Sequence, residues 1–434
     1  MITNISTVFA NKSEGEAVTV QGWVYRHRLG SAGSMVFAVI RDHSGIVQAT
    51  IKKENVDEKS WKESSEAYVE SSVVVTGKVK KDDRAPGGYE LQVEKFETVC
   101  RGEPFPIAKD LSEEFLLDVR HLWIRSQKLT KILQIRSTMI QAIHEFFQKR
   151  GYTLFDPPIL SPNACEGKMT LFEVQYFDTK MYLTQSWQLY AEAAIFGLGK
   201  IYDVAPTFRA EKSKTSRHLA EFWMAEMEAP WMELDEAAQV AKDEIKFLIE
   251  RVLEKHEEDL KFLGRDIGKL KAAIAKPFPT ITYTEVLRIL KEKDGMDVKW
   301  GEDLRTIEEE TVMKHFDTPV VVTNYPVDIM AFYKPRDPKD PKTALCFDML
   351  APEGFGEIVG GSQRSLDIED MKKRIEKEEG NPEDYSWYFD LRKYGSVPHS
   401  GYGVGVERVL RWICSMENIK DAIAFPRTMS RNKP

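Results

Sequence analysis

Hydrophobic and polar residues alternate along the first hundred positions with a period of two, which is typical of half-buried β-strands. The alternating runs cover 18–25, 36–42, 46–51, 72–80 and 88–98, and turns containing Gly separate several of them. Lys59 to Glu70 has the pattern of a short helix instead. Five strands with one helix after the third predict an OB barrel over residues 1–100, a fold that binds oligonucleotides on its open strand face.

The pattern changes after a proline-rich stretch at 101–106, and we interpret 101–125 as a linker or hinge. Beyond it, apolar residues recur every three or four positions in two long segments, which predicts amphipathic helices over 126–150 and 234–263. Buried strands are expected between and after them, at 182–186, 224–228, 319–326 and 346–350. Residues 264–318 have the pattern of a charged helical insert, in which we find no chemistry. The predicted fold class is therefore α+β, with the second domain over 126–434.

Composition narrows the possible functions. The chain has 434 residues and a mass of 49.8 kDa, which predicts two or three domains. Lys and Arg number 61 against 69 Asp and Glu, a net charge of 61 − 69 = −8, so binding to nucleic acid would need a local basic face. The four cysteines form no CxxC pair, which argues against a zinc site and suits a reducing cytoplasm. We find neither a signal-peptide pattern nor an apolar run of transmembrane length.

The stretch 208–222 predicts a hairpin that carries candidate chemistry. Arg209 and Glu211 are two positions apart and would share one face of its outgoing strand. A polar loop follows, with Arg217 and His218 on its far side, and Phe222 lies at the start of the return strand. The cations of this stretch could bind phosphate, its carboxylate could accept from a polar group, and its aromatic ring could stack on a base. On this stretch alone, a surface hairpin with solvated charges is an equal alternative.

A second group of candidates lies toward the C-terminus. Asp348 and Glu357 fall at facing positions of two predicted strands and offer oxygen ligands for Mg²⁺ held between protein and nucleotide phosphates. A pair that stabilises the turn is the alternative. Arg364 can hold a carboxylate bidentately. Glycines at 401, 403 and 405 would bare one face of a strand for a flat ring. Arg408 begins the next helix, where a guanidinium and a helix N-terminus both favour phosphate.

Other candidates lie near these two groups or in the barrel. Glu166 lies in a polar loop that could act as a lid, and Gln185 and Gln188 lie where a strand meets a helix. Glu226 and Glu228 share a face of the return strand and would need a cationic or amide partner if buried. In the barrel, Arg26, His27 and Arg28 supply local cations, while Phe37 could stack on a base and Gln48 could read a base edge. Phe37 is equally explained as barrel core.

Two arginines, a carboxylate pair, a ring and a glycine-bared strand together describe an ATP site without a P-loop. In this order the residues resemble the class II aminoacyl-tRNA synthetases of the aspartyl, asparaginyl and lysyl subgroup. Asp156-Pro157-Pro158 resembles the dimer-interface motif, 208–222 the second motif, and 403–408 the third. The resemblance covers nearly the whole chain apart from 264–318. It implies an antiparallel sheet flanked by helices, in a homodimer, with an N-terminal anticodon-binding domain.

The resemblance also implies roles for the matching positions. Catalysis would rest on Arg209, Arg408 and Glu357. ATP would be bound by Arg209, Ala210, Glu211, Arg217, His218, Leu219, Phe222, Glu357, Gly405, Val406, Glu407 and Arg408, and Mg²⁺ would be held at Asp348, Glu357 and Gly360. The amino acid would be bound by Glu166, Gln185, Gln188, Ala191, Arg209, Glu226, Glu228, Gly360 and Arg364, and the anticodon by Arg26, Phe37, Gln48 and Glu90.

The charged residues of the predicted pocket indicate which amino-acid side chain it binds. Arg364 argues against a lysyl enzyme, whose pocket should offer carboxylates alone. Enzymes of the aspartyl type carry a Lys after the Gln-Ser-x-Gln segment, where this chain has Ala191. We therefore expect L-asparagine as the amino acid and tRNA(Asn) as the partner, with Glu226 or Glu228 accepting from the amide. An aspartyl enzyme that charges one or both tRNAs stays open, as do an amino-acid ligase without tRNA and a non-enzymatic RNA-binding protein.

Overall fold

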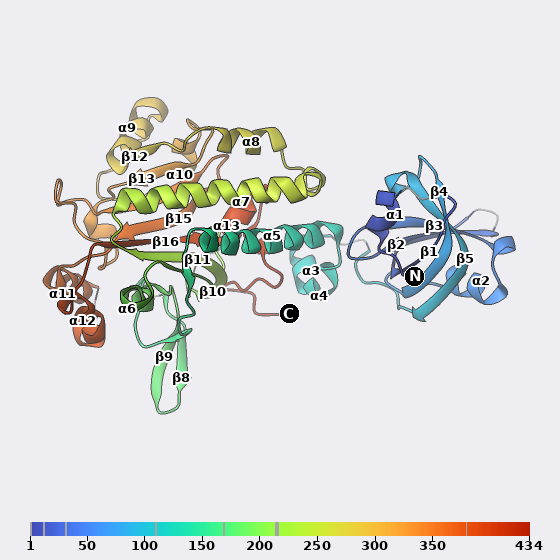
Figure 1. Cartoon of the computed structure of the whole chain (residues 1–434), viewed down its shortest axis with the longest axis horizontal. Coiled ribbons are helices and arrows are strands. Elements are labelled where there is room, and N and C mark those ends of the chain that lie inside the picture. The colour runs from blue at the N-terminus through green and yellow to red at the C-terminus, as the bar shows by residue number, and fades with distance from the viewer. Residues whose placement is uncertain are drawn as a thin grey trace. The chain divides into compact units, whose positions relative to one another are not determined.

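The computed structural model describes residues 2–11, 14–30, 33–108, 111–167, 170–212, 217–378 and 380–434. The chain divides into two compact units, Met1–Val119 and Arg120–Pro434. Figure 1 shows the elements of each unit along the chain.

The first unit is a closed five-stranded barrel with the strand order β1-β2-β3-β5-β4. Its strands are β1 (Ala17–Leu29), β2 (Met35–Arg41), β3 (Ile46–Lys52), β4 (Ser72–Lys81) and β5 (Tyr89–Cys100). Alternate residues are buried along β2, and the apolar ones fill the barrel, as the period of two predicts. The helices are α1 (Ile5–Asn11) and α2 (Glu58–Ser65), and α2 ends earlier than the sequence pattern predicted. The predicted OB barrel is thus confirmed.

The second unit is built on an eight-stranded sheet with the order β12-β13-β14-β15-β16-β11-β10-β6. These strands are β6 (Thr153–Leu154), β10 (Ile201–Phe208), β11 (Glu221–Pro230), β12 (Thr280–Thr282), β13 (Val320–Thr323), β14 (Cys346–Ala351), β15 (Gly356–Gln363) and β16 (His399–Gly405). The central pairs are antiparallel, as expected, but β12 pairs with β13 and β6 with β10 in parallel, so the sheet is mixed. A small sheet of β7 (Leu160–Ser161), β9 (Thr179–Leu183) and β8 (Glu173–Tyr176) lies beside it.

Two long helices, α5 (Gln127–Lys149) and α7 (Leu234–Phe262), run side by side across one face of this sheet (Figure 1). Their apolar residues pack with those of the strands into the main core. Ser126 caps α5 by accepting a hydrogen bond from the Leu129 amide, and Gly151 with φ +75° follows its end. Both predicted helices are confirmed.

The remaining helices are shorter. They are α3 (Glu113–Asp118), α4 (Arg120–Trp123), α6 (Gln188–Leu198), α8 (Ile267–Ala275), α9 (Tyr283–Asp294), α10 (Thr306–Met313), α11 (Ile368–Lys377), α12 (Ser386–Lys393) and α13 (Val406–Ile413). The stretch 264–318 is therefore not simply a helical insert, because β12 within it forms one edge of the main sheet. Across the described part of the chain, every helix is too short or too polar to cross a membrane.

Candidate active site

A cavity opens on the sheet of the second unit and encloses ≈ 1020 Å³, its open mouth included. Strands β11, β14, β15 and β16 and the starts of α6 and α13 contribute residues to its walls. Many predicted site residues line it: Glu166, Gln188, Arg209, Glu211, Arg217, His218, Leu219, Phe222, Glu226, Asp348, Glu357, Gly360, Arg364, Gly405, Glu407 and Arg408. Positions up to 242 residues apart, from Glu166 to Arg408, thus converge as the sequence analysis expected.

The predicted hairpin is present, but its outgoing strand is shorter than expected. Strand β10 ends at Phe208, so Arg209 and Glu211 lie beyond it and do not share a strand face. The Arg209 amide still donates to Ala220 O (3.0 Å), whereas the Ala210 amide turns away to donate to Thr170 O (2.7 Å). Residues 213–216, which form the predicted polar loop, are outside the described residues. The Arg209 guanidinium lies 5.5 Å from the ring centroid of Phe222.

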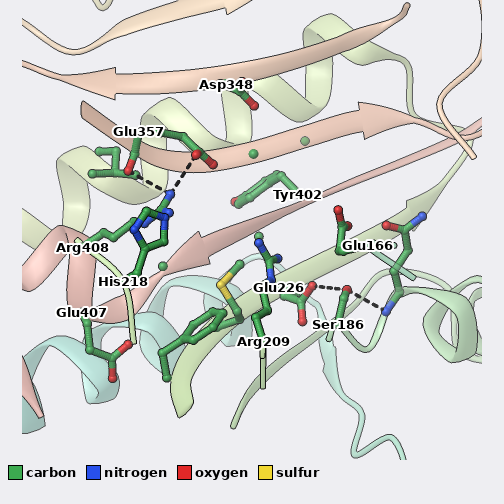
Figure 2. A pocket seen from close by; sticks show the side chains of 18 of the residues that line it. Glu166, Ser186, Arg209, His218, Glu226, Asp348, Glu357, Tyr402, Glu407 and Arg408 are labelled. Atoms are coloured by element: carbon green, nitrogen blue, oxygen red, sulfur yellow. Dashed lines mark hydrogen bonds and ion pairs between the residues drawn. The ribbon is translucent and has the colours of Figure 1, made fainter. Parts of the chain in front are cut away.

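Two cations of the cavity are paired with carboxylates. Arg408 Nη1 donates to Glu357 Oε2 (2.8 Å), as Figure 2 shows. Arg217 Nη1 donates to Glu309 Oε2 (3.0 Å). Glu309 lies on α10, in the stretch where the sequence analysis found no chemistry, so that interpretation was wrong. Burial, with Glu357 nearby, raises the pKa of Glu309 to about 7. No local sequence signal marks this residue.

His218 lies between opposing influences. Its Nε2 is 3.4 Å from Glu211 Oε2. Burial, with the Arg408 guanidinium nearby, holds the pKa of His218 below its usual value despite Glu211. At neutral pH the ring is therefore mainly uncharged and able to donate one hydrogen bond and accept another.

Asp348 and Glu357 come from neighbouring strands, but they are not directly opposite each other. The register shifts between Met349 and Leu350, so Asp348 pairs with Gly360, and Glu357 with Leu350. Their carboxylates nevertheless converge above Gly360, where an added Cβ would lie 3.4 Å from Glu357 Oε1 and 3.5 Å from Asp348 Oδ1.

The electrostatics of this pair fit a divalent cation. Burial and the charge of Glu357 raise the pKa of Asp348 to about 8. Burial alone would raise the pKa of Glu357, but Arg408 outweighs it and holds that pKa below its usual value. A hard cation would offset this repulsion. Among the described residues no group of three or more His, Cys, Asp or Glu side chains could hold a metal, so further ligands would have to come from substrate or water.

The glycine-bared strand is β16, and it lies beside a second bare segment in β15. Gly403 pairs with Gly360 across the two strands. A Cβ at Gly403 would come within 2.5 Å of Met224 Cε, and one at Gly401 within 2.0 Å of Glu228 Oε2. Gly360, Gly361, Gly403 and Gly405 thus give the cavity a floor of bare backbone, and at Gly403 the end of the Met224 side chain lies against it.

Glu407 lines the cavity, but its carboxylate is engaged by neighbouring protein groups, and Val406 lies in the core. Glu407 Oε2 accepts from the Trp223 amide (2.9 Å), and Oε1 pairs with Arg136 (2.7 Å). Figure 2 shows the Glu407 carboxylate pointing away from the other labelled side chains. Val406 is fully buried in the main core and does not line the cavity, so its side chain does not support the predicted contact with ATP, whereas Glu407 does belong to the lining.

At the other end of the cavity, Glu226 and Glu228 have the partners that their burial requires. Glu226 accepts from Ser186 Oγ (2.6 Å) and from the Trp187 amide (3.2 Å), and burial raises its pKa to about 7. Glu228 is fully buried and accepts from Arg364 Nε (3.0 Å) and Nη2 (2.7 Å). Glu226 and Arg364 line the cavity, whereas Glu228 lies behind Arg364 and does not.

Besides Glu228, two predicted amino-acid contacts lie outside the cavity lining. Gln185 accepts from the amides of Cys165 and Glu166 (both 3.0 Å) and donates to Gly167 O (2.9 Å), so it holds the loop that carries Glu166. Ala191 is fully buried in α6. Glu166 itself faces the cavity and accepts from the Tyr333 hydroxyl (2.6 Å).

The sequence analysis missed other residues that line the cavity, among them Ser186, Met224, Tyr333, Lys334 and Tyr402. Ser186 was open to prediction, because it lies between Gln185 and Gln188 in the segment already singled out. Tyr333 and Lys334 belong to a connection without a periodic pattern, and only the fold brings them here.

In the barrel, three of the four predicted nucleic-acid residues are at least partly exposed, whereas Glu90 is buried. Phe37 is half-buried on the outer face of β2, with the Arg28 guanidinium 4.9 Å from its ring centroid, so the alternative that it is barrel core is wrong. Arg26 is exposed. Gln48 Nε2 donates to Glu90 Oε2 (3.2 Å) from the neighbouring strand. A ring, two cations and an amide–carboxylate pair thus lie on the four adjoining strands β1, β2, β3 and β5.

Comparisons with known proteins agree with this geometry. Residues 112–429 match the family model of class II tRNA synthetases (D, K and N), and residues 18–99 match that of the OB-fold nucleic acid binding domain. The asparagine–tRNA ligase of Koribacter versatilis is 46% identical over 99% of both chains, and that of Thermococcus gammatolerans is 47% identical over 97% of both. The asparaginyl-tRNA synthetase of Pyrococcus horikoshii complexed with asparaginyl-adenylate is 46% identical, with a TM-score of 0.93 over 98% of this chain and 97% of that one.

Proposed function

Since this chain belongs to the class II tRNA synthetases of the aspartyl, lysyl and asparaginyl group, we propose that it is an asparagine–tRNA ligase. It would activate L-asparagine with ATP to asparaginyl-adenylate and pass the amino acid to the 3′ end of tRNA(Asn). The observation that carries the amino-acid specificity is the Arg364–Glu228 pair at the end of the cavity. A guanidinium already balanced by a carboxylate suits a neutral amide better than a second carboxylate.

The proposed reaction needs fixed charge rather than a side-chain nucleophile. The carboxylate of asparagine attacks the α-phosphorus of ATP, and the transition state gathers negative charge on phosphoryl oxygens. Arg209 is proposed to hold the α-phosphate and the substrate carboxylate, while Arg217, His218 and Arg408 hold the outer phosphates. A hydroxyl of the terminal tRNA ribose then attacks the adenylate carbonyl, the mixed-anhydride bond breaks, and AMP leaves as the aminoacyl ester forms.

The nucleotide's ring is proposed to lie between the aromatic ring of Phe222 and the backbone floor around Gly403. The presence of both Phe222 and Gly403 in the cavity lining supports this placement, as does the Arg209 guanidinium 5.5 Å from the Phe222 ring centroid. Glu211 would accept a hydrogen bond from the adenine amino group. Mg²⁺ would be held by Asp348 and Glu357 above Gly360, where it would supply positive charge to the departing pyrophosphate.

The site for the amino acid is proposed to lie between Glu166, Gln188, Glu226 and Arg364, all of which line the same end of the cavity. Because Glu228 does not line it, Glu226 is the better candidate to meet the substrate directly. A carboxyl whose pKa lies near 7 can accept from an ammonium or amide group and adapt its charge to the bound group.

The rest of the assignment concerns tRNA and assembly. We propose residues 1–100 as the anticodon-binding domain, 101–125 as the hinge and 126–434 as the catalytic domain, in a cytoplasmic enzyme. We also propose a homodimer through Asp156-Pro157-Pro158, because Leu154 and Ile159 on either side expose 45% and 43% of their surface. Light scattering after size exclusion would test the dimer, and a monomer at micromolar concentration would refute it.

ATP–pyrophosphate exchange measured separately with asparagine and aspartate tests the central proposal. We expect exchange with asparagine to exceed that with aspartate by a large factor. Faster exchange with aspartate would refute the proposal and favour an aspartyl enzyme. Deleting residues 1–100 should abolish tRNA charging while exchange persists, and charging that survives the deletion would refute the role of the barrel.

A further inference from the structure

Glu192 is a fully buried carboxylate one helical turn beyond Gln188 on α6. It accepts from Gln188 Nε2 (2.9 Å), from the Tyr388 hydroxyl (2.8 Å), from His399 Nε2 (3.0 Å) and from Arg392 Nη2. Burial acts to raise its pKa, but the cation of Arg392 and the hydrogen bond from His399 outweigh it and hold the pKa well below its usual value. Glu192 is therefore an ionised group beneath the cavity, outside its lining.

The contact with Gln188 fixes which end of that amide faces the cavity. A carboxylate can only accept, so the amide nitrogen of Gln188 must face Glu192. Because Gln188 lines the cavity, its carbonyl oxygen remains for a ligand. The side chain thus presents an acceptor, which suits an ammonium or an amide NH₂ and repels a carboxylate.

Glu192 also balances Arg364, the cation that a substrate carboxylate would seek. Arg364 Nε lies 4.0 Å from Glu192 Oε1, and Glu228 binds the same guanidinium at 2.7–3.2 Å. Two buried carboxylates therefore face one guanidinium. Charges at such distances interact strongly inside a protein, where water screens them little.

A cation and a histidine ring lie on the other side of Glu192 and complete the network. Arg392 is always charged. His399 Nδ1 lies 2.7 Å from Val397 O and its Nε2 lies 3.0 Å from Glu192 Oε2. The network is thus a chain of alternating charge from Arg392 through Glu192 to Arg364.

We propose that Glu192 determines specificity for the amino-acid side chain, although it does not touch the substrate. It orients Gln188 as an acceptor and, with Glu228, keeps Arg364 from attracting a carboxylate. The proposal rests on the proposed asparagine–tRNA ligase activity and deepens it. The sequence explains a preference for the amide by a cation missing at Ala191, and the structure adds an anion present at Glu192.

The test is Glu192→Gln, which keeps the shape and an acceptor oxygen but removes the charge. ATP–pyrophosphate exchange gives kcat and KM for asparagine and for aspartate. We expect the ratio of kcat/KM for asparagine over aspartate to fall at least about tenfold, while KM for ATP changes less than about twofold. The control is Glu353→Gln, which breaks an ion pair with buried Arg265 (2.6 Å) away from the cavity and should leave the ratio unchanged.

A second variant, Arg392→Gln, removes a cation from the same network and gives a test of opposite sign. If charge sets specificity, it should raise the ratio that Glu192→Gln lowers. Losses that are equal for both amino acids, with unchanged ratios, would mean that Glu192 is merely structural and would overturn the proposal. If Glu192→Gln does not fold, a ratio that fails to rise in Arg392→Gln overturns it alone. A wild-type enzyme inactive with asparagine would instead overturn the proposed function.

Discussion

The stability contributed by the buried Arg364–Glu228 ion pair can be predicted and measured. Both side chains are almost fully buried, with 5% and 0% exposed, and the guanidinium makes three contacts of 2.7–3.2 Å with the carboxylate. Removing one partner of such a pair leaves a buried charge uncompensated, at a cost of about 3–5 kcal/mol in the free energy of unfolding. We expect this loss for Glu228→Gln and for Arg364→Met separately.

The double variant should lose less than the sum of the two single losses. Removing the second partner also removes the stranded charge, so a coupling energy of about 2–3 kcal/mol is expected. Urea unfolding followed by tryptophan fluorescence gives these values, because Trp187 and Trp412 are buried in the same unit. Glu369→Gln, which breaks the exposed pair with Lys372 (3.2 Å), serves as the control and should not change stability within error. Additive losses would refute the reasoning that the pair acts as one unit.

Three further predictions concern other parts of the site. Burial raises the pKa of Glu244 to about 8, so its contribution to the free energy of unfolding is full below about pH 4.5 and is lost as the pH rises through 8. Urea unfolding at each pH between 6 and 8 gives the slope of the unfolding free energy against pH. Glu244→Gln should remove up to about 1.4 kcal/mol per pH unit from that slope. Gly401→Ala should prevent stable folding, because its Cβ would lie 2.4 Å from the backbone oxygen Met227 O. Gly403→Ala should still unfold cooperatively on heating, because the nearest atom to its Cβ is the flexible end of Met224. Equal melting temperatures of the two variants would contradict this prediction. Gln185→Leu should raise KM for the amino acid roughly tenfold in the exchange assay by releasing the loop of Glu166, and an unchanged KM would exclude that positioning role.

Local periodicity predicted most of the architecture. Burial of alternate strand residues, or of one helix face, produces a regular pattern of apolar residues over a few neighbouring positions. The barrel strands and the helix around Met139 follow from it. The exact register does not, since the shift between Met349 and Leu350 depends on how two strands pair. The end of β10 at Phe208 likewise depends on a tertiary contact, in which Ala210 bonds to Thr170 rather than to the hairpin partner.

The sequence analysis identified residues that line the cavity where residue type and motif coincide, as for Arg209 and Arg408. The sequence analysis failed where the role of a residue depends on the direction in which its side chain points. Gln185 and Gln188 looked equivalent in sequence, but the start of α6 turns one toward a loop and the other toward the cavity. Glu309 carries no motif, and only the packing of α10 brings it to Arg217.

The pairing of the arginines with carboxylates has a consequence for how the cavity handles anions. Arg217, Arg364 and Arg408 each have a carboxylate within 3.0 Å before any substrate arrives. In the proposed reaction, a phosphate that binds Arg217 or Arg408 has to compete with the resident carboxylate for the guanidinium, so it gains less than it would from an unpaired arginine. When the leaving phosphate groups depart, the carboxylates are already in place to take the guanidinium groups back. The paired carboxylates would thus let the cavity hold several cations without binding the released phosphate groups too tightly.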